Sequence, residues 1–189
     1  MTFIAAPETT PRIQALYDED LADYGYVMNL NRAWAHQPDA HDGLFELIGS
    51  VARAGGLSMR ERGILVTACA STMGDSYCSI AWGGKLSSET DPAFAAAVLT
   101  GTDEGLSDAE RAIAAWARQV AADPNATTAA DVEALRAVGL SDAKIFAITT
   151  FVALRLAFST VNDALGAVPD AELRAGAPAA VLDAVTWGR

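Results

Sequence analysis

Cys78 is the residue whose position in the sequence best suits it for chemistry. Gly74 can adopt the left-handed conformation that ends a helix, and Asp75 is a good N-cap for the helix that follows. Counted from that cap, Cys78 is the third helical residue, so its thiol lies near unpaired backbone N–H groups and the positive end of the helix dipole. Both favour the thiolate, which makes Cys78 a candidate nucleophile or redox residue.

Other features of the sequence point the opposite way. A carboxylate as close as that of Asp75 favours the neutral thiol, and free cysteines are commonly buried as small apolar residues. Cys69 lies nine positions before Cys78, on the preceding predicted helix. It is either a core residue or, if the turn brings the Cα atoms within about 7 Å, a partner for a disulfide.

A polar stripe on a long apolar segment is the second candidate site. Arg155, Ser159 and Asn162 follow a spacing of four and then three residues, so they share one helix face. Polar groups on such a helix must be paired inside the protein, solvated, buried at a subunit interface or used to bind a ligand.

The two histidines, His36 and His41, lack partners at metal-ligand spacing. They flank a predicted turn at residues 37–39, so we expect surface or capping roles for them. The sequence has no glycine-rich phosphate loop, nucleotide fingerprint, Ser-His-Asp set or zinc pattern. It therefore predicts no metal and no cofactor.

The elements that would position these groups are helices. Alanine is abundant and no run of alternating β-branched residues is present, which indicates an all-α protein. Leu57-Ser58-x-x-Glu61-Arg62 recurs as Leu106-Ser107-x-x-Glu110-Arg111, and each contains a capping box that starts a helix. Leu140-Ser141 is a partial third copy. The recurrence reflects either the similarity of good helix starts or an old duplication.

The predicted helices follow from caps, glycines and prolines. They are residues 11–23; a short helix through Leu30 and Trp34 that stops before Pro38; a helix capped by Asp39 or Asp42 and ended by Gly55-Gly56; 58–73; a helix beginning at Asp75; 94–99; 107–122; a helix capped by Thr127 or Thr128 and closed by Gly139; 142–165; and one or two short helices in 169–189.

Composition excludes several classes of partner. The net charge is −11, from 24 acidic and 13 basic residues, which argues against binding to nucleic acid or to an anionic membrane surface. Residues 1–10 lack the pattern of a secretion signal, and the uncharged apolar stretch 145–154 is too short to span a bilayer. We therefore expect a cytoplasmic protein with reduced cysteines.

The central motifs resemble one known family. A helix that opens with Leu57-Ser58-x-Arg60-Glu61-Arg62, followed by a glycine turn and by Tyr77-Cys78 at a helix start, resembles the carboxymuconolactone decarboxylase and alkylhydroperoxidase D-like superfamily. Residues 24–29 and 35–38 resemble the lead-in of its peroxidase-related branch. Residues 106–111, 138–142 and 162–166 resemble its second half.

The resemblance covers about residues 12–170 and implies an AhpD-like helical fold and a homo-oligomer, commonly a trimer or hexamer. It also implies one domain over residues 1–189, with a lead-in at about 1–56, a core motif at about 57–86 and a second helical half at about 106–168.

In the peroxidase members, a glutamate, a Cys-x-x-Cys pair and a histidine carry the reaction. The resemblance places the second cysteine at Cys78, the first at Asp75, the histidine at Trp82 and the glutamate at Gly63, so one of the four groups is retained. Glu61 is nearby, but the capping box explains it and it lies on a different helix face. The decarboxylase members use a histidine around the position of Trp82, which is absent here as well.

Three functions remain open from the sequence. The first is an antioxidant, peroxidase-related protein in which Cys78 is the only retained redox residue and an external thiol reduces it. The second is a lyase or isomerase acting on a small organic acid, in a pocket formed by Tyr77, Trp82, Arg155 and Asn162. The third is a non-catalytic oligomeric binding protein.

Overall fold

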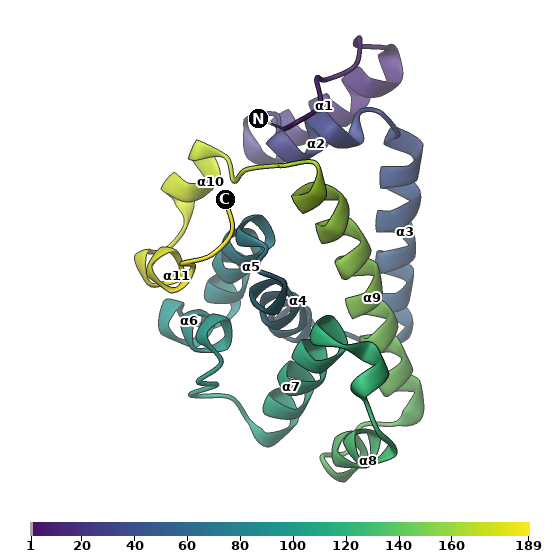
Figure 1. The fold of residues 1–189 in the computed structure, drawn as a ribbon, viewed down its shortest axis with the longest axis vertical. Coiled ribbons are helices and arrows are strands. Elements are labelled where there is room, and N and C mark those ends of the chain that lie inside the picture. The colour runs from purple at the N-terminus through teal and green to yellow at the C-terminus, as the bar shows by residue number, and fades with distance from the viewer. Residues whose placement is uncertain (1) are drawn as a thin grey trace.

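The computed structural model describes residues 2–189, and within them every regular element is a helix (Figure 1). The all-α class predicted from the sequence is therefore confirmed. The elements are α1 (Pro11–Tyr24), α2 (Asn29–Trp34), α3 (Pro38–Ala54), α4 (Met59–Met73), α5 (Ser76–Glu89), α6 (Pro92–Thr100), α7 (Asp108–Ala122), the 3₁₀ turn η1 (Pro124–Ala126), α8 (Ala129–Ala137), α9 (Asp142–Ala164), α10 (Ala171–Gly176) and α11 (Ala179–Ala184).

Helix α4 forms the centre of the molecule, where it packs against α5, α6, α7 and α9 (Figure 1). Residues 63–70 are buried without interruption, as expected for a helix that neighbours cover on every side. The helix starts with the predicted capping box, in which the Ser58 hydroxyl accepts from the Glu61 amide and the Glu61 carboxylate accepts from the Ser58 amide.

The starts of α4, α7 and α9 lie close together. Ser58, Ser107 and Ser141 are the three N-caps. Arg60 of α4 forms an ion pair with Glu110 of α7, and Lys144 of α9 lies 2.8 Å from the carboxylate of Glu61. Each copy of the recurring Leu-Ser pattern therefore starts a helix at the same end of the core.

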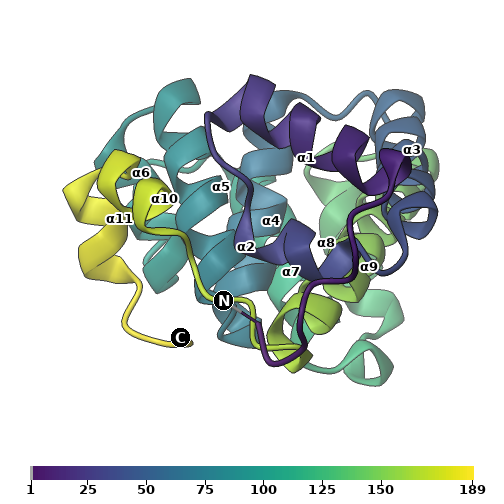
Figure 2. The same ribbon diagram turned by 90° about the horizontal axis from the view of Figure 1, so that it is seen from above.

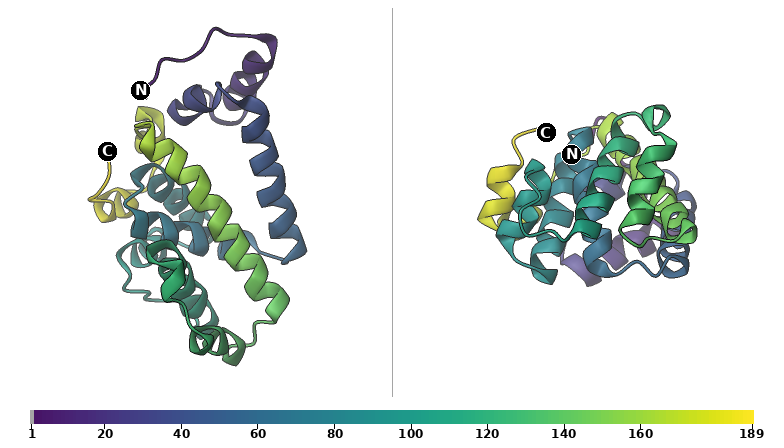
Figure 3. Two further views of the ribbon diagram at one scale, coloured as in Figure 1. Left: turned by 45° about the vertical axis from the view of Figure 1, so that its right-hand side comes forward. Right: turned by 90° about the horizontal axis from the view of Figure 1, so that it is seen from below.

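The remaining helices cover this core. Helices α3 and α9 pack against each other and run in opposite directions (Figure 3). Helices α1 and α2 lie over one end of the molecule (Figure 2), and α10 and α11 cover α5 and α6 on the side away from α9. The cavity described below lies beneath α1, between α3, α5 and α9.

Two predicted helix starts differ from the structure: α6 begins at Pro92 rather than at residue 94, and the start of α3 has a different cap. Helix α3 begins at Pro38 with Gln37 as the N-cap, whereas the sequence predicts Asp39 or Asp42 as the cap. Proline suits the first helical position because its missing N–H is unpaired there in any case. The earlier start puts His41 in the first turn of the helix rather than beside a turn. For α8 the cap is Thr128, one of the two predicted residues.

Helix α9 is the one helix among residues 2–189 that is long and apolar enough to cross a membrane by length and composition. Half of its most apolar window is buried inside the protein, and it packs against α3, α4, α7 and α8. Arg155 also faces inward. These are the features of a core helix.

Candidate active site

The local structure around Cys78 is the one expected from the sequence. Helix α4 ends at Gly74, whose φ of 74° is left-handed, and the Asp75 carboxylate caps α5 by accepting a hydrogen bond from the Cys78 amide at 2.9 Å. Cys78 is 2% exposed and lies in the wall of a cavity. Cys78 is therefore positioned to meet a ligand, but not bulk solvent.

The surroundings of the Cys78 thiol favour its neutral form, whereas the helix start alone would favour the thiolate. Burial raises the pKa of Cys78 far above its ordinary value, and the Asp75 carboxylate raises it further. Arg155 Nη2 lies 3.6 Å from the sulfur and Ser159 Oγ lies 3.5 Å from it, and both lower the pKa. Their effect is smaller than the effect of burial.

Arg155 is a buried cation without an anionic partner. It is 4% exposed, and no carboxylate among residues 2–189 forms an ion pair with it. Its Nε is buried without a hydrogen-bond partner. The guanidinium lies 5.0, 5.2 and 5.9 Å from the ring centres of Phe158, Trp82 and Phe45. Aromatic faces attract a cation, but they compensate little of the cost of removing it from water.

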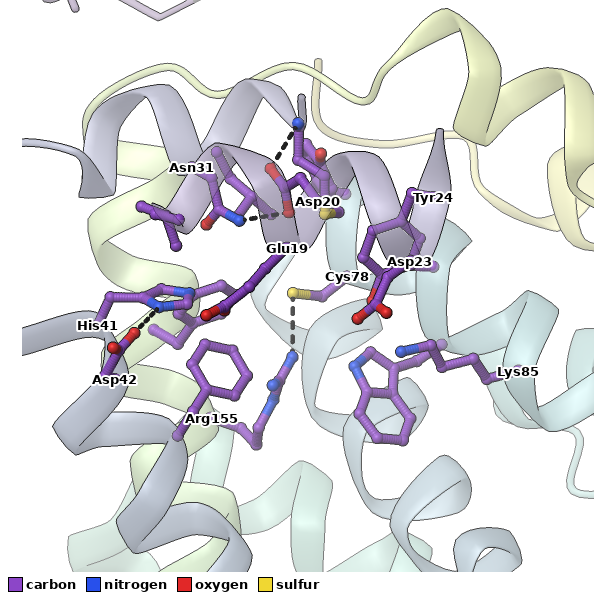
Figure 4. A pocket seen from close by; sticks show the side chains of 18 residues that line it. Glu19, Asp20, Asp23, Tyr24, Asn31, His41, Asp42, Cys78, Lys85 and Arg155 are labelled. Carbon is purple, nitrogen blue, oxygen red and sulfur yellow. Dashed lines mark hydrogen bonds and ion pairs between the residues drawn. The ribbon is translucent and has the colours of Figure 1, made fainter. Parts of the chain in front are cut away.

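The cavity next to Arg155 and Cys78 has a volume of about 400 Å³ (Figure 4). Its walls are mostly aromatic and aliphatic, Arg155 lies at its inner end, and carboxylates line the side formed by α1. The lining residues are Leu16, Glu19, Asp20, Asp23, Tyr24, Met28, Leu30, Asn31, His41, Asp42, Phe45, Tyr77, Cys78, Ala81, Trp82, Lys85, Arg155 and Phe158.

Of the predicted site residues, four line this cavity: Cys78, Tyr77, Trp82 and Arg155. Tyr77 is 1% exposed and its hydroxyl donates to Asp170, so its polar atom already has a partner. Trp82 lies between Arg155 and Lys85, whose Nζ is 5.1 Å from the centre of its ring.

The other two predicted site residues lie outside the cavity. Asn162 is fully buried, and its side-chain oxygen accepts a hydrogen bond from Trp34 Nε1 at 2.9 Å, so its position is structural. Asp75 is fully buried as the cap of α5, and its Oδ2 has no hydrogen-bond partner. The three residues of the stripe therefore have different surroundings. Arg155 lies in the cavity wall, Ser159 lies behind the thiol, and Asn162 lies beneath Trp34.

Gly63 and Cys69 are both packed inside the protein. A Cβ atom at Gly63 would lie 3.0 Å from Leu86 Cδ1, so Leu86 would have to shift before α4 could carry a side chain there. Cys69 and Cys78 are both free and buried, and burial raises the pKa of Cys69 to about 12. Cys69 is therefore a core residue, which is one of the two roles that the sequence predicts for it.

Sequence reasoning missed the residues that α3 contributes. His41, Asp42 and Phe45 line the cavity, although His41 was expected to have a surface or capping role. The signal was present in Pro38: a helix that begins there puts residues 41 and 45 on one face. Phe158, three residues after Arg155, was missed because nothing marked it within an apolar helix. His36 is exposed, as expected.

No family model and no curated protein matches this sequence, so the comparison rests on solved structures. The alkylhydroperoxidase AhpD core of an uncharacterized peroxidase-related protein from Ralstonia eutropha JMP134 superposes with a TM-score of 0.80, at 25% identity over 91% of this chain and 94% of that one. This chain has the AhpD fold. The predicted resemblance to the alkylhydroperoxidase D-like superfamily is thus confirmed by the structural neighbours.

Two further structures have the same fold. A peroxidase-related protein from Silicibacter sp. TM1040 gives a TM-score of 0.80 at 21% identity, over 91% of this chain and 93% of that one. A cysteine-to-alanine variant of the debrominase Bmp8, in complex with 2,3,4-tribromopyrrole, gives 0.73 at 19% identity, over 96% and 97% of the two chains. The AhpD fold is therefore found both in proteins described as peroxidase-related and in a debrominase.

Proposed function

We propose that this protein binds a small organic acid with an aromatic or apolar body in the cavity beside Cys78, as a member of the lyase or isomerase class. The observation that carries the proposal is Arg155, a buried guanidinium that faces a cavity and has no carboxylate partner. An uncompensated buried charge costs several kcal/mol, and a ligand carboxylate would offset that cost. A guanidinium also matches a carboxylate in geometry, because it can donate two parallel hydrogen bonds.

The remainder of the ligand is inferred from the walls. Phe45, Trp82 and Phe158 surround the guanidinium and present their rings to the same space. A cavity of about 400 Å³ is in the range of small-molecule sites. The debrominase Bmp8, which shares the fold, forms a complex with a small planar aromatic molecule. An aromatic or unsaturated acid of about a dozen heavy atoms fits these features.

Calorimetry with 3-phenylpropanoate tests the proposal, and phenethylamine serves as the cationic counterpart. We expect the acid to bind and the amine not to bind. Arg155→Met keeps an unbranched side chain of similar length and removes the charge, so the affinity for the acid should fall at least tenfold. Arg118→Met is the matched control, because Arg118 forms its ion pair with Asp103 outside the cavity. Equal affinities of the wild type and Arg155→Met would refute the proposal.

Thiol redox chemistry is the second candidate, and the position of Cys78 in the cavity wall favours it. A hydroperoxide in the cavity would meet the thiol, oxidise it to the sulfenic acid and leave as the alcohol, and an external thiol would then reduce the sulfenic acid. The raised pKa of Cys78 argues for slow oxidation, because the thiolate is the reactive form.

Peroxide consumption in the presence of dithiothreitol distinguishes the two candidates. A peroxidase loses its activity in Cys78→Ser and keeps it in Cys69→Ser, whereas equal rates in the wild type and in Cys78→Ser exclude this candidate. If the protein binds the acid, consumes no peroxide and converts no acid, the non-catalytic binding protein remains as the function.

A further inference from the structure

His41 lines the cavity, and the proposed function does not use its imidazole ring. The side chain is 13% exposed and lies in the first turn of α3. Its ring packs against Phe45 at 4.6 Å and Trp34 at 5.7 Å between ring centres, with Phe158 at 6.4 Å. The imidazole is therefore held in place by three aromatic rings while it lines the same cavity as Cys78 and Arg155 (Figure 4).

The hydrogen bond to Asp42 fixes which nitrogen can accept a proton. His41 Nδ1 lies 3.1 Å from Asp42 Oδ1, and an ionised carboxylate only accepts, so Nδ1 carries the hydrogen in the neutral ring. Nε2 then has a free lone pair, and none of residues 2–189 donates to it. Arg12 of α1 binds the other oxygen of Asp42, which anchors the carboxylate that orients the ring.

Charged groups from α1, α3 and α9 surround the imidazole. Asp42 stabilises the imidazolium that forms when Nε2 takes a proton. Asp20 of α1 also faces the ring, although its carboxylate is already bound to the Met28 amide and to Asn31. Glu19, from the same helix, points its carboxylate into the cavity near His41 (Figure 4). Arg155 of α9 opposes these carboxylates from the inner end of the cavity.

We propose that His41, oriented by Asp42, is the proton-accepting group of this cavity and takes a proton from a carbon atom of the bound acid, a step for which an aromatic 2-oxo acid is a suitable substrate. The inference rests on the proposed function, because Arg155 holds the carboxylate. Nε2 takes a proton from the carbon next to the ketone, and the C–H electron pair forms the carbon–carbon double bond of the enol. The imidazolium then gives its proton to the ketone oxygen. The enol product has the same composition as the ketone, so the step needs no oxidant and no cofactor.

Phenylpyruvate is the probe for this inference, since its benzylic protons are acidified by the ketone. Exchange of these protons for deuterium in D₂O, followed by proton NMR, measures the step directly. We expect the wild-type protein to exchange them faster than buffer alone. His41→Asn should reduce the protein-dependent rate at least tenfold, as is usual when a general base is lost. The affinity for phenylpyruvate, measured by calorimetry, should change less than about threefold, because Arg155 supplies the charge that binds the acid.

The chain offers a matched control in its other histidine. His36 is exposed, bonds to the Ala5 carbonyl and does not line the cavity, so His36→Asn should exchange phenylpyruvate at the wild-type rate. If His41→Asn does not fold by circular dichroism, Asp42→Asn replaces it, because loss of the carboxylate should lower the exchange rate while leaving the ring present.

The outcomes separate the two proposals. Exchange at the wild-type rate in His41→Asn overturns the role of His41, and so does a wild-type protein that binds phenylpyruvate without accelerating exchange. Both results leave the proposed function standing. If neither phenylpyruvate nor 3-phenylpropanoate binds in a manner that depends on Arg155, the proposed function itself fails.

Discussion

Asp75→Asn should make the Cys78 thiol more reactive with little effect on the fold. Asparagine is as good an N-cap as aspartate, so the hydrogen bond to the Cys78 amide can be kept. The substitution removes one negative charge that helps to raise the pKa of Cys78. Burial remains the larger cause and is unchanged, so the thiol should stay above its ordinary pKa.

The size of the effect follows from the geometry. The Asp75 oxygen lies 2.9 Å from the Cys78 amide, which puts the carboxylate next to the thiol. A unit charge at about 5 Å and an effective dielectric constant of about 20 contributes about 3 kcal/mol, or about 2 pKa units. Because neighbouring groups reorganise, we expect the pKa to fall by about 1 to 2 units. Thiolate nucleophilicity falls together with pKa, so alkylation at pH 8 should accelerate about 3- to 10-fold.

The assay is the rate of iodoacetamide alkylation as a function of pH, in a Cys69→Ser background so that Cys78 is the thiol observed. Asp91→Asn is the control, because Asp91 caps α6 by accepting from the Phe94 amide at 2.9 Å, the same bond that Asp75 makes. A pH profile that does not move in Asp75→Asn would refute the electrostatic argument. An equal acceleration in Asp91→Asn would assign the effect to loosening of a cap.

Further predictions concern stability and assembly. Burial raises the pKa of Asp163 to about 6, so the neutral carboxyl contributes stability that is fully present below pH 3.8 and is lost as the pH rises through 6. Asp163→Asn should therefore raise the free energy of unfolding at pH 7 by on the order of 1 kcal/mol, a value reduced for solvent screening, and leave it unchanged at pH 3 in urea titrations. Gly63→Ala should destabilise by about 1 to 3 kcal/mol because its Cβ would press on Leu86, whereas Gly84→Ala in the open part of α5 should stabilise by up to about 1 kcal/mol. Equal thermal shifts in the two variants would contradict the packing argument. Light scattering of the native protein tests the homo-oligomer that the family resemblance implies, and a monomer at micromolar concentration would contradict it.

Local signals predicted the helices and the position of the thiol well. The capping boxes at Ser58 and Ser107 and the Gly74–Asp75 turn are contained within a few residues, and the structure has all of them. A cap depends on neighbours along the chain, so its signal survives in the sequence. The starts of α3 and α6 differ because each helix begins at a proline, Pro38 or Pro92, that precedes the predicted start.

The electrostatic state of the site could not be predicted in the same way. Whether Cys78 is a thiolate depends on how completely it is buried, and that burial comes from helices far away in the sequence. The sequence alone left Arg155 with several possible partners, from an internal acid to a subunit interface. The fold gives it three aromatic rings and no carboxylate. His41 became a site residue through the packing of α3 against α9.

The fluorescence of Trp82 should also respond to what the cavity contains. The indole lies half-buried in the wall, with the Arg155 guanidinium 5.2 Å and the Lys85 ammonium 5.1 Å from its ring centre. An anion bound to Arg155 would neutralise one of these two positive charges close to the indole, where the protein screens electrostatic interactions weakly. The emission of Trp82, one of the four tryptophans in the chain, should therefore shift as the cavity fills, and this shift should be absent in Trp82→Phe.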